Sequence, residues 1–185
     1  MELLGKIFFH LLIVVAGVYG VLAGYKKGIM RQIGSVVALA FAIVAAYVLG
    51  GNVEEWLWDY LSAWKAFNAI YVAKTLAVMT VFFPVYFLLD LCLIPLSRLM
   101  RTFESGILNS IGGALFRTFK YFLFLSLCYN LLIDIKPTSA LAQTSRHHDG
   151  NIVEGVVKIA PFILDFPGGE EVVYRQQLED AKKIS

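Results

Sequence analysis

Charged residues are scarce in this sequence. Only 16% of its 185 residues are Asp, Glu, Lys or Arg, whereas 58% are apolar and the mean hydropathy is +0.69. A soluble domain has about 25% charged residues, so water is not the solvent for most of this chain. The formal net charge of +2 is also too small to indicate a nucleic-acid partner. Composition therefore predicts an integral membrane protein whose first partner is the lipid bilayer.

Cysteine and the motifs of common enzymes are also missing or rare. Both cysteines, Cys92 and Cys128, lie inside apolar runs, where cysteine serves as a packing group more often than as a disulfide or ligand pair. The chain has no phosphate-binding glycine loop, no zinc-protease helix motif and no glycine-flanked nucleophilic serine. We therefore expect a protein that is not an enzyme, with no catalytic residues, cofactor or metal site.

Long apolar runs are what the sequence does contain. Four of them approach or exceed the roughly 20 residues that cross a bilayer core, and they span residues 7–24, 33–50, 69–96 and 111–133. The first run is longer than the apolar part of a signal peptide and is followed by basic residues instead of a cleavage site, so we expect it to stay attached. The predicted fold class is an all-α integral membrane protein with four transmembrane helices in two hairpins, plus short interfacial helices.

The composition changes after the fourth run. Residues 1–135 are interpreted as a four-helix membrane domain, and residues 136–185 as a tail with a short amphipathic helix near 152–166. This helix is too short to span a bilayer, so it is expected to lie at the interface or to form a lid on the bundle. Pro161 is expected to kink or end it.

Lys and Arg are distributed unevenly among the loops. The first loop has Lys26, Lys27 and Arg31 without an acid, and the third has Arg98 and Arg101 against Glu104. Acids dominate the second loop, which has Glu54, Glu55 and Asp59 against Lys65. Because basic loops stay on the cytoplasmic side, loops one and three are predicted to be cytoplasmic. Both termini are then extracytoplasmic.

The second loop also holds all three tryptophans. Trp56, Tyr60, Trp64 and Phe67 recur at helical spacing, and Trp and Tyr concentrate at the headgroup level of membranes. We therefore expect a short helix within residues 51–68 that lies flat on the outer surface. A soluble extracellular helix is the alternative.

Small residues recur every four positions in three of the four runs, which in membranes indicates close helix contacts. The series are Gly34, Ala38, Ala42, Ala46 and Gly50 in the second run, Gly20, Gly24 and Gly28 in the first, and Gly106, Ser110, Ala114 and Thr118 around the start of the fourth. Such a seam packs either within one subunit or against a second copy or another membrane protein, so a homo-oligomer is possible.

Asp90, Arg117 and Lys120 are ionisable residues inside the apolar runs, where charges are costly and often functional. Asp90 lies six residues before the end of the third run and Arg117 six residues into the fourth, so both lie roughly 9 Å from the same membrane face. We predict that Asp90 pairs with Arg117 or Lys120. The alternatives are basic side chains that snorkel towards water, a purely structural ion pair, and a transport or proton-relay site.

The junction of the first two runs carries a family resemblance. Gly24 is followed by Lys27, Gly28 and Arg31, and this segment resembles the basic-Gly-x-x-Arg-Glu turn of the CvpA family, the colicin V production proteins, with Gln32 in the position of the usual glutamate. Residues 106–113 are similar to a second signature, Gly-x-Asp-Arg-x-x-Gly, with Asn109 and Ser110 in place of the acid and arginine. The resemblance implies a bacterial inner-membrane protein linked to toxin production or export and to envelope homeostasis.

Two functional hypotheses follow. The first is a non-enzymatic inner-membrane protein that supports production or secretion of a colicin V-like toxin and envelope homeostasis. The second is a small membrane channel or transporter that uses Asp90 and the basic residues of the fourth run. A water-filled path lined by these charges would favour the second hypothesis, whereas a dry, apolar interior would favour the first.

Overall fold

The computed structural model describes residues 2–61, 69–99, 106–136 and 152–165, and these residues contain helices and tight turns but no strand. The elements are α1 (Glu2–Lys27), the 3-10 turn η1 (Met30–Gln32), α2 (Ile33–Leu61), α3 (Ala69–Cys92), α4 (Ile94–Leu99), α5 (Ile107–Ile135) and α7 (Ile152–Leu164). Four of them, α1, α2, α3 and α5, are long and apolar enough to cross a membrane. The all-α class with four spans is confirmed.

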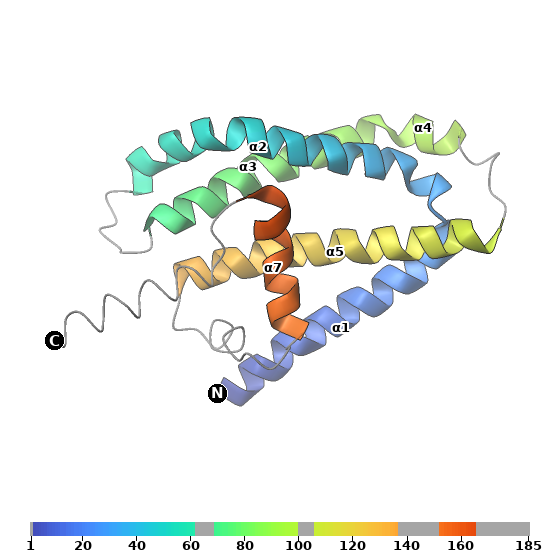
Figure 1. Cartoon of the computed structure of the whole chain (residues 1–185), viewed down its shortest axis with the longest axis horizontal. Helices are drawn as coiled ribbons and strands as arrows, with labels where there is room; N and C mark the ends of the chain where they lie inside the picture. The colour runs from blue at the N-terminus through green and yellow to red at the C-terminus, as the bar shows by residue number, and fades with distance from the viewer. Residues whose placement is uncertain (1, 62–68, 100–105, 137–151, 166–185) are drawn as a thin grey trace.

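The long helices form two close pairs, α2 with α3 and α1 with α5 (Figure 1). The pairs meet mainly where α3 packs on α5. Chain order suggested two hairpins, one of the first span with the second and one of the third span with the fourth. The first hairpin does not form, because α1 and α2 diverge from their junction (Figure 1). The third and fourth spans, α3 and α5, do touch as expected. The reason is that the glycine-bearing face of α1 fits the backbone of α5 more closely than it fits any other helix.

The second loop begins later than expected, because α2 continues without a break through Leu61. Residues 51–61 contain no proline, and the glycines at 50 and 51 do not interrupt the helix. Trp56 and Tyr60 are exposed on this extension, with their rings 5.0 Å apart. The expected separate surface helix is therefore, up to Leu61, the end of α2. Trp64 and Phe67 lie outside the described residues.

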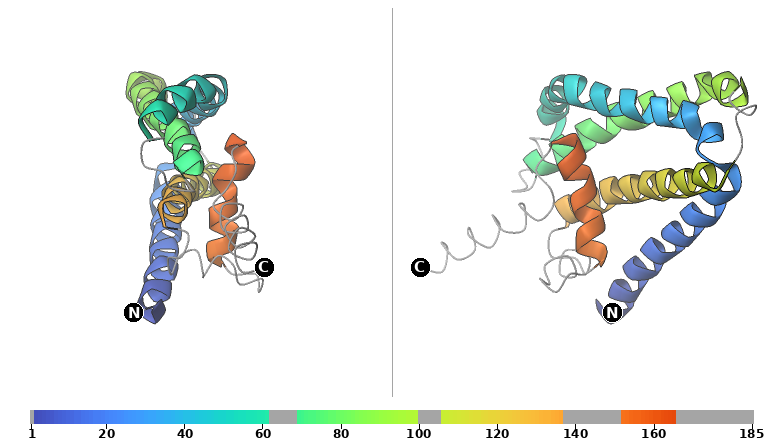
Figure 2. Two further views of the ribbon diagram at one scale, coloured as in Figure 1. Left: turned by 90° about the vertical axis from the view of Figure 1, so that its left-hand side faces the viewer. Right: turned by 45° about the vertical axis from the view of Figure 1, so that its right-hand side comes forward.

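The short helix near the C-terminus is held across α5 (Figure 2). Its buried face consists of Val153, Val156, Val157, Ala160 and Leu164. The helix runs past Pro161 to Leu164, so of the two expected effects of the proline, a kink or an end, the end does not occur. The rest of the predicted tail, residues 137–151 and 166–185, lies outside the described residues.

Two buried side chains of α5 explain why α7 tolerates Pro161. Proline has no backbone N–H, so the carbonyl of Val157 loses its usual helical partner. Ser126 Oγ donates to this carbonyl oxygen at 2.9 Å, and Asn130 Nδ2 donates to it at 2.8 Å. Ser126 Oγ also accepts from the backbone N–H of Ala160 at 2.9 Å. The carbonyl freed by the proline is thus satisfied by α5, and the additional bond from Ala160 also fixes α7 on the bundle.

Candidate functional site

The site begins at the turn between α1 and α2. α1 ends at Lys27, and Gly28 has a φ of +70°, in the left-handed region that closes helices and favours glycine. Its N–H donates to the carbonyl of Gly24 at 2.9 Å. A Cβ atom on Gly28 would also lie 2.3 Å from Asn109 Nδ2. Both the backbone conformation and the neighbouring side chain therefore require glycine here.

Asn109, at the start of α5, holds this turn in place. Its backbone carbonyl accepts from the N–H of Ile29 at 2.9 Å, and its Oδ1 accepts from the N–H of Met30 at 3.0 Å. Gln32 makes the reciprocal contact, because its Nε2 donates to the carbonyls of Gly28 at 3.0 Å and Gly113 at 3.2 Å. The two segments that carry the family resemblance thus pack directly on each other.

Backbone contact between α1 and α5 continues from this turn. A methyl group on Gly24 would lie 2.3 Å from the carbonyl oxygen of Gly113, and one on Gly20 would lie 2.8 Å from the Cα of Thr118. No methyl fits at these distances, so the small residues allow the two helices to approach. On α5 the contact face includes Asn109 and Gly113, whereas Gly106 has nothing within 4 Å of an added Cβ.

The five small residues of the α2 seam are all buried. Ala38 and Ala42 belong to the apolar core that α2 shares with α3, together with Phe82 and Tyr86. An added Cβ on Gly34 would lie 2.7 Å from the carbonyl oxygen of Leu93. In this structure the seam packs within one chain.

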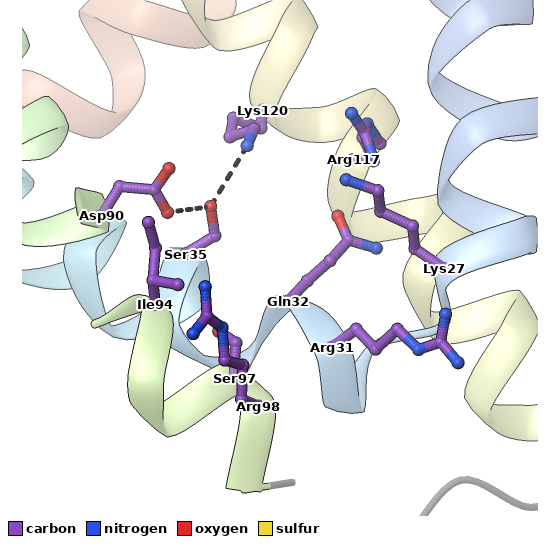
Figure 3. Close-up of a pocket in the computed structure, with 10 residues that line it drawn as sticks. All are labelled: Lys27, Arg31, Gln32, Ser35, Asp90, Ile94, Ser97, Arg98, Arg117 and Lys120. Carbon is purple, nitrogen blue, oxygen red and sulfur yellow. Dashed lines mark hydrogen bonds between the residues drawn. The ribbon is translucent and has the colours of Figure 1, made fainter. Parts of the chain in front are cut away.

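A polar cavity of about 440 Å³ opens where the turn, α3, α4 and α5 converge (Figure 3). We call it the cationic recess and define it by its lining residues, Lys27, Arg31, Gln32, Ser35, Asp90, Ile94, Ser97, Arg98, Arg117 and Lys120. Five of these side chains are basic and one is acidic, a formal excess of four positive charges. All three predicted intramembrane charges, Asp90, Arg117 and Lys120, are among them.

Ser35 stands between Asp90 and Lys120. Its hydroxyl donates to Asp90 Oδ1 at 2.5 Å and accepts from Lys120 Nζ at 3.2 Å. Since a hydroxyl has a single proton, the 2.9 Å contact between Ser35 and Tyr86 must use the tyrosine proton. Lys120 Nζ also donates to Tyr86 OH at 2.9 Å. The prediction that Asp90 pairs directly with Arg117 or Lys120 is therefore wrong, because Ser35 lies between Asp90 and Lys120 and bonds to both.

Arg117 contacts α1 and its own helix, α5. Its Nε donates to Tyr121 OH at 3.1 Å, and its guanidinium carbon lies 6.0 Å from the centre of the Tyr19 ring and 5.7 Å from that of Tyr121. These are distances at which a cation is attracted to an aromatic face. Arg117 thus contacts two neutral aromatic rings, one on α1 and one on α5, and it forms no ion pair with Asp90.

The recess is closed on its inner side. Moving along α3 and α5 away from Asp90 and Lys120, the rings of Tyr86 and Phe124 pack with centres 5.1 Å apart, and Phe82 follows at 5.8 Å from Phe124. Leu123 and Leu127 belong to the same apolar cluster and are fully buried. The charged cavity is therefore a recess at one end of the bundle that meets an apolar layer between α3 and α5.

Several residues of the site escaped the sequence analysis because they are neutral. Ser35, Tyr86 and Ser97 carry no charge that would single them out within an apolar run, and Ser97 accepts from the N–H of Gly34 at 3.2 Å. The same holds for Thr75, whose hydroxyl donates to the buried Asp134 at 2.5 Å near the opposite end of the bundle. The sequence signal that could have identified these residues is a neutral polar side chain within a membrane span.

The comparison with known proteins gives one result. The family profile described as Colicin V production protein matches residues 9–149, a stretch that includes nearly all of the four long helices, both segments of the α1–α5 junction and every residue that lines the cationic recess. No curated protein and no solved structure matches the chain.

Proposed function

Because the chain belongs to the colicin V production protein family, we propose that it supports the production or secretion of a colicin V-like toxin, and envelope homeostasis, as a multi-pass protein of the bacterial inner membrane. The observation that carries the proposal is the family match over residues 9–149, which takes in the membrane-spanning part of the chain rather than an appended segment. The role therefore belongs to the helical bundle.

The contribution we propose is non-enzymatic. The sequence supports this because it lacks the nucleophile, phosphate-loop and metalloprotease motifs. The exposed apolar faces of α1 and α5 offer surface for lipid, for a second copy or for other membrane proteins. The protein then acts by binding or by scaffolding.

The test is a deletion in a bacterial host that makes a colicin V-like toxin, complemented with the full-length chain. We expect less toxin activity in the medium of the deletion strain, restored by the chain. Toxin that accumulates inside the cells indicates secretion, whereas a fall in both fractions indicates production. Unchanged toxin in both fractions contradicts the proposal.

The orientation is proposed from the basic loops. The recess, with Lys27, Arg31 and Arg98 around it, then faces the cytoplasm, and both termini face outward. A reporter fused after Ser185 that is active only outside the cytoplasm is the expected result. A reporter active only in the cytoplasm overturns the orientation.

A small channel or transporter is the second candidate, favoured by one observation. Asp90, Arg117 and Lys120 do line a single cavity. The apolar layer of Phe82, Leu123 and Phe124 behind it argues for the first candidate, because a permeation path would have to open through it. Ion flux into vesicles that contain the purified chain, abolished by Lys120→Gln, would establish the second candidate in place of the first.

A further inference from the structure

We propose that the cationic recess binds a phosphate group that carries net negative charge, such as the headgroup of an anionic phospholipid or a soluble phosphate compound. The proposal goes beyond the role in toxin production and does not depend on it. It rests on the charges in the recess, on their present partners and on the size of the cavity.

The first argument is that four of the five positive charges, those of Lys27, Arg98, Arg117 and Lys120, lack direct anionic partners among the described residues. The side chains of Lys27 and Arg98 form no hydrogen bond or ion pair with any described residue. Lys120 and Arg117 are partly buried, yet they donate only to hydroxyl groups, those of Ser35 and Tyr86 for the lysine and of Tyr121 for the arginine. Withdrawing cations from water is costly unless an anion pairs with them. An anion in the recess would supply that partner.

The second argument is that the single acid does not fill this role. Asp90 Oδ1 accepts the Ser35 proton, and no ion pair joins its carboxylate to a described basic residue. Even if Asp90 is ionised, its one negative charge faces the four positive charges of Lys27, Arg98, Arg117 and Lys120, which leaves an excess of three. Figure 3 shows Lys27, Arg117 and Lys120 directed towards the same space, with Arg98 on the side of Ser35 and Ser97, whereas Arg31 extends away from them. Like charges gathered in this way repel each other until an anion binds between them.

The third argument concerns the kind of anion. Arg and Lys are the residues that recognise phosphate oxygens, Arg through its planar fork of N–H donors and Lys as a point charge. The volume of about 440 Å³ lies within the range of about 300–1,000 Å³ typical of small-molecule pockets. The recess therefore has room for a phosphate together with the group to which it is esterified, such as glycerol.

Its position suits a lipid headgroup. The recess lies at the end of the bundle where the basic loops are, which the loop charges assign to the cytoplasmic leaflet. Anionic lipids give this leaflet its negative surface potential, and basic pockets between membrane helices on this side are known to hold such headgroups. Lys120 lies 13 residues into α5, roughly 20 Å along the helix from Ile107, so the recess reaches inward from the headgroup level.

The test uses the full-length chain purified in a zwitterionic detergent. Short-chain phosphatidylglycerol, short-chain phosphatidylcholine, glycerol 3-phosphate and inorganic phosphate are titrated separately, and binding is followed by the shift in melting temperature and by native mass spectrometry. Lys27→Gln is compared with Lys26→Gln, because both lysines are exposed neighbours but only Lys27 lines the recess. Arg98→Gln is a second, independent variant for the recess.

We expect phosphatidylglycerol to bind and phosphatidylcholine not to. Lys27→Gln and Arg98→Gln should each weaken binding by about fivefold or more, the factor equivalent to the ~1 kcal/mol that a basic residue contributes near an anionic membrane surface. Lys26→Gln should leave binding unchanged. Binding of phosphatidylglycerol alone identifies a lipid headgroup, whereas binding of glycerol 3-phosphate or inorganic phosphate with the same dependence on Lys27 identifies a soluble ligand. The proposal is overturned if none of the anions binds, or if Lys26→Gln weakens binding as much as Lys27→Gln.

Discussion

The side-chain amide of Gln32 donates to the carbonyl oxygen of Gly113, 81 positions later in the chain, at 3.2 Å. The same Nε2 donates to the carbonyl of Gly28 at 3.0 Å, so one amide connects the α1–α2 turn to α5. A carboxylate, which the family resemblance gives as usual at this position, has no proton to donate to either carbonyl. In this chain the glutamine is what makes the contact possible.

Gln32→Glu should therefore destabilise the junction. Gln32 is 5% exposed, so the substitution would leave the carbonyls of Gly28 and Gly113 without their side-chain donor. The basic residues of the recess would offset the added charge but would not replace these two hydrogen bonds. We expect a loss of about 3 kcal/mol in the free energy of unfolding, measured by denaturation in detergent at neutral pH. Asn52→Asp makes the same amide-to-acid exchange at an exposed position and should change stability little. Equal effects of the two substitutions would show that the Gln32 contacts contribute nothing specific.

Gly24→Ala should separate α1 from α5. The added methyl would lie 2.3 Å from the Gly113 carbonyl oxygen, and backbone on both sides leaves no flexible side chain to move away. Overpacking of this kind costs about 1–3 kcal/mol. Gly51→Ala is the matched control, because its methyl would meet nothing within 4 Å. It should stabilise α2 by up to about 1 kcal/mol through helix propensity. Thermal melting of the two variants in detergent should therefore shift in opposite directions.

Asp90 should be energetically coupled to Lys120 and not to Arg117. A double-mutant cycle of Asp90→Asn with Lys120→Gln is expected to depart from additivity by about 0.5–2 kcal/mol, because both side chains bond to Ser35. The cycle with Arg117→Gln should be additive within about 0.5 kcal/mol, since Arg117 contacts Tyr19 and Tyr121 instead. Introducing Ser35→Ala should reduce the first coupling. A coupling to Lys120 that survives this change would mean that Ser35 is not the bridge.

Ser126→Ala should weaken the packing of α7 on α5, and the loss of stability should be larger when residue 161 is proline than when it is alanine. The substitution removes a donor to the Val157 carbonyl and the acceptor for the Ala160 N–H, which we expect to cost about 1–3 kcal/mol. Pro161→Ala restores a backbone N–H that can bond the Val157 carbonyl within α7, so Ser126→Ala should cost less in that background. Hydrogen exchange of residues 152–164 measures both. The same acceleration in the two backgrounds would refute this account.

The sequence by itself determined the fold class and the number of spans. Bilayer thickness sets the length of a spanning helix, so the four apolar runs correspond to α1, α2, α3 and α5 without any knowledge of their packing. The sequence also placed Asp90, Arg117 and Lys120 at one end of the bundle, because depth along a helix follows from residue number. Their gathering in one cavity agrees with that arithmetic.

Only the tertiary structure decided which helices pair and what stands between the charges. Hydropathy cannot rank helix partners in lipid, where every helix is apolar and the choice depends on close surface fit. Gly24 meets Gly113, and α1 therefore packs on α5 instead of on its neighbour α2. The depth of Asp90 and Lys120 likewise gives no direction around the helix axis. Ser35, a neutral residue from a third helix, occupies the space between them and turns an expected ion pair into a hydrogen-bonded bridge.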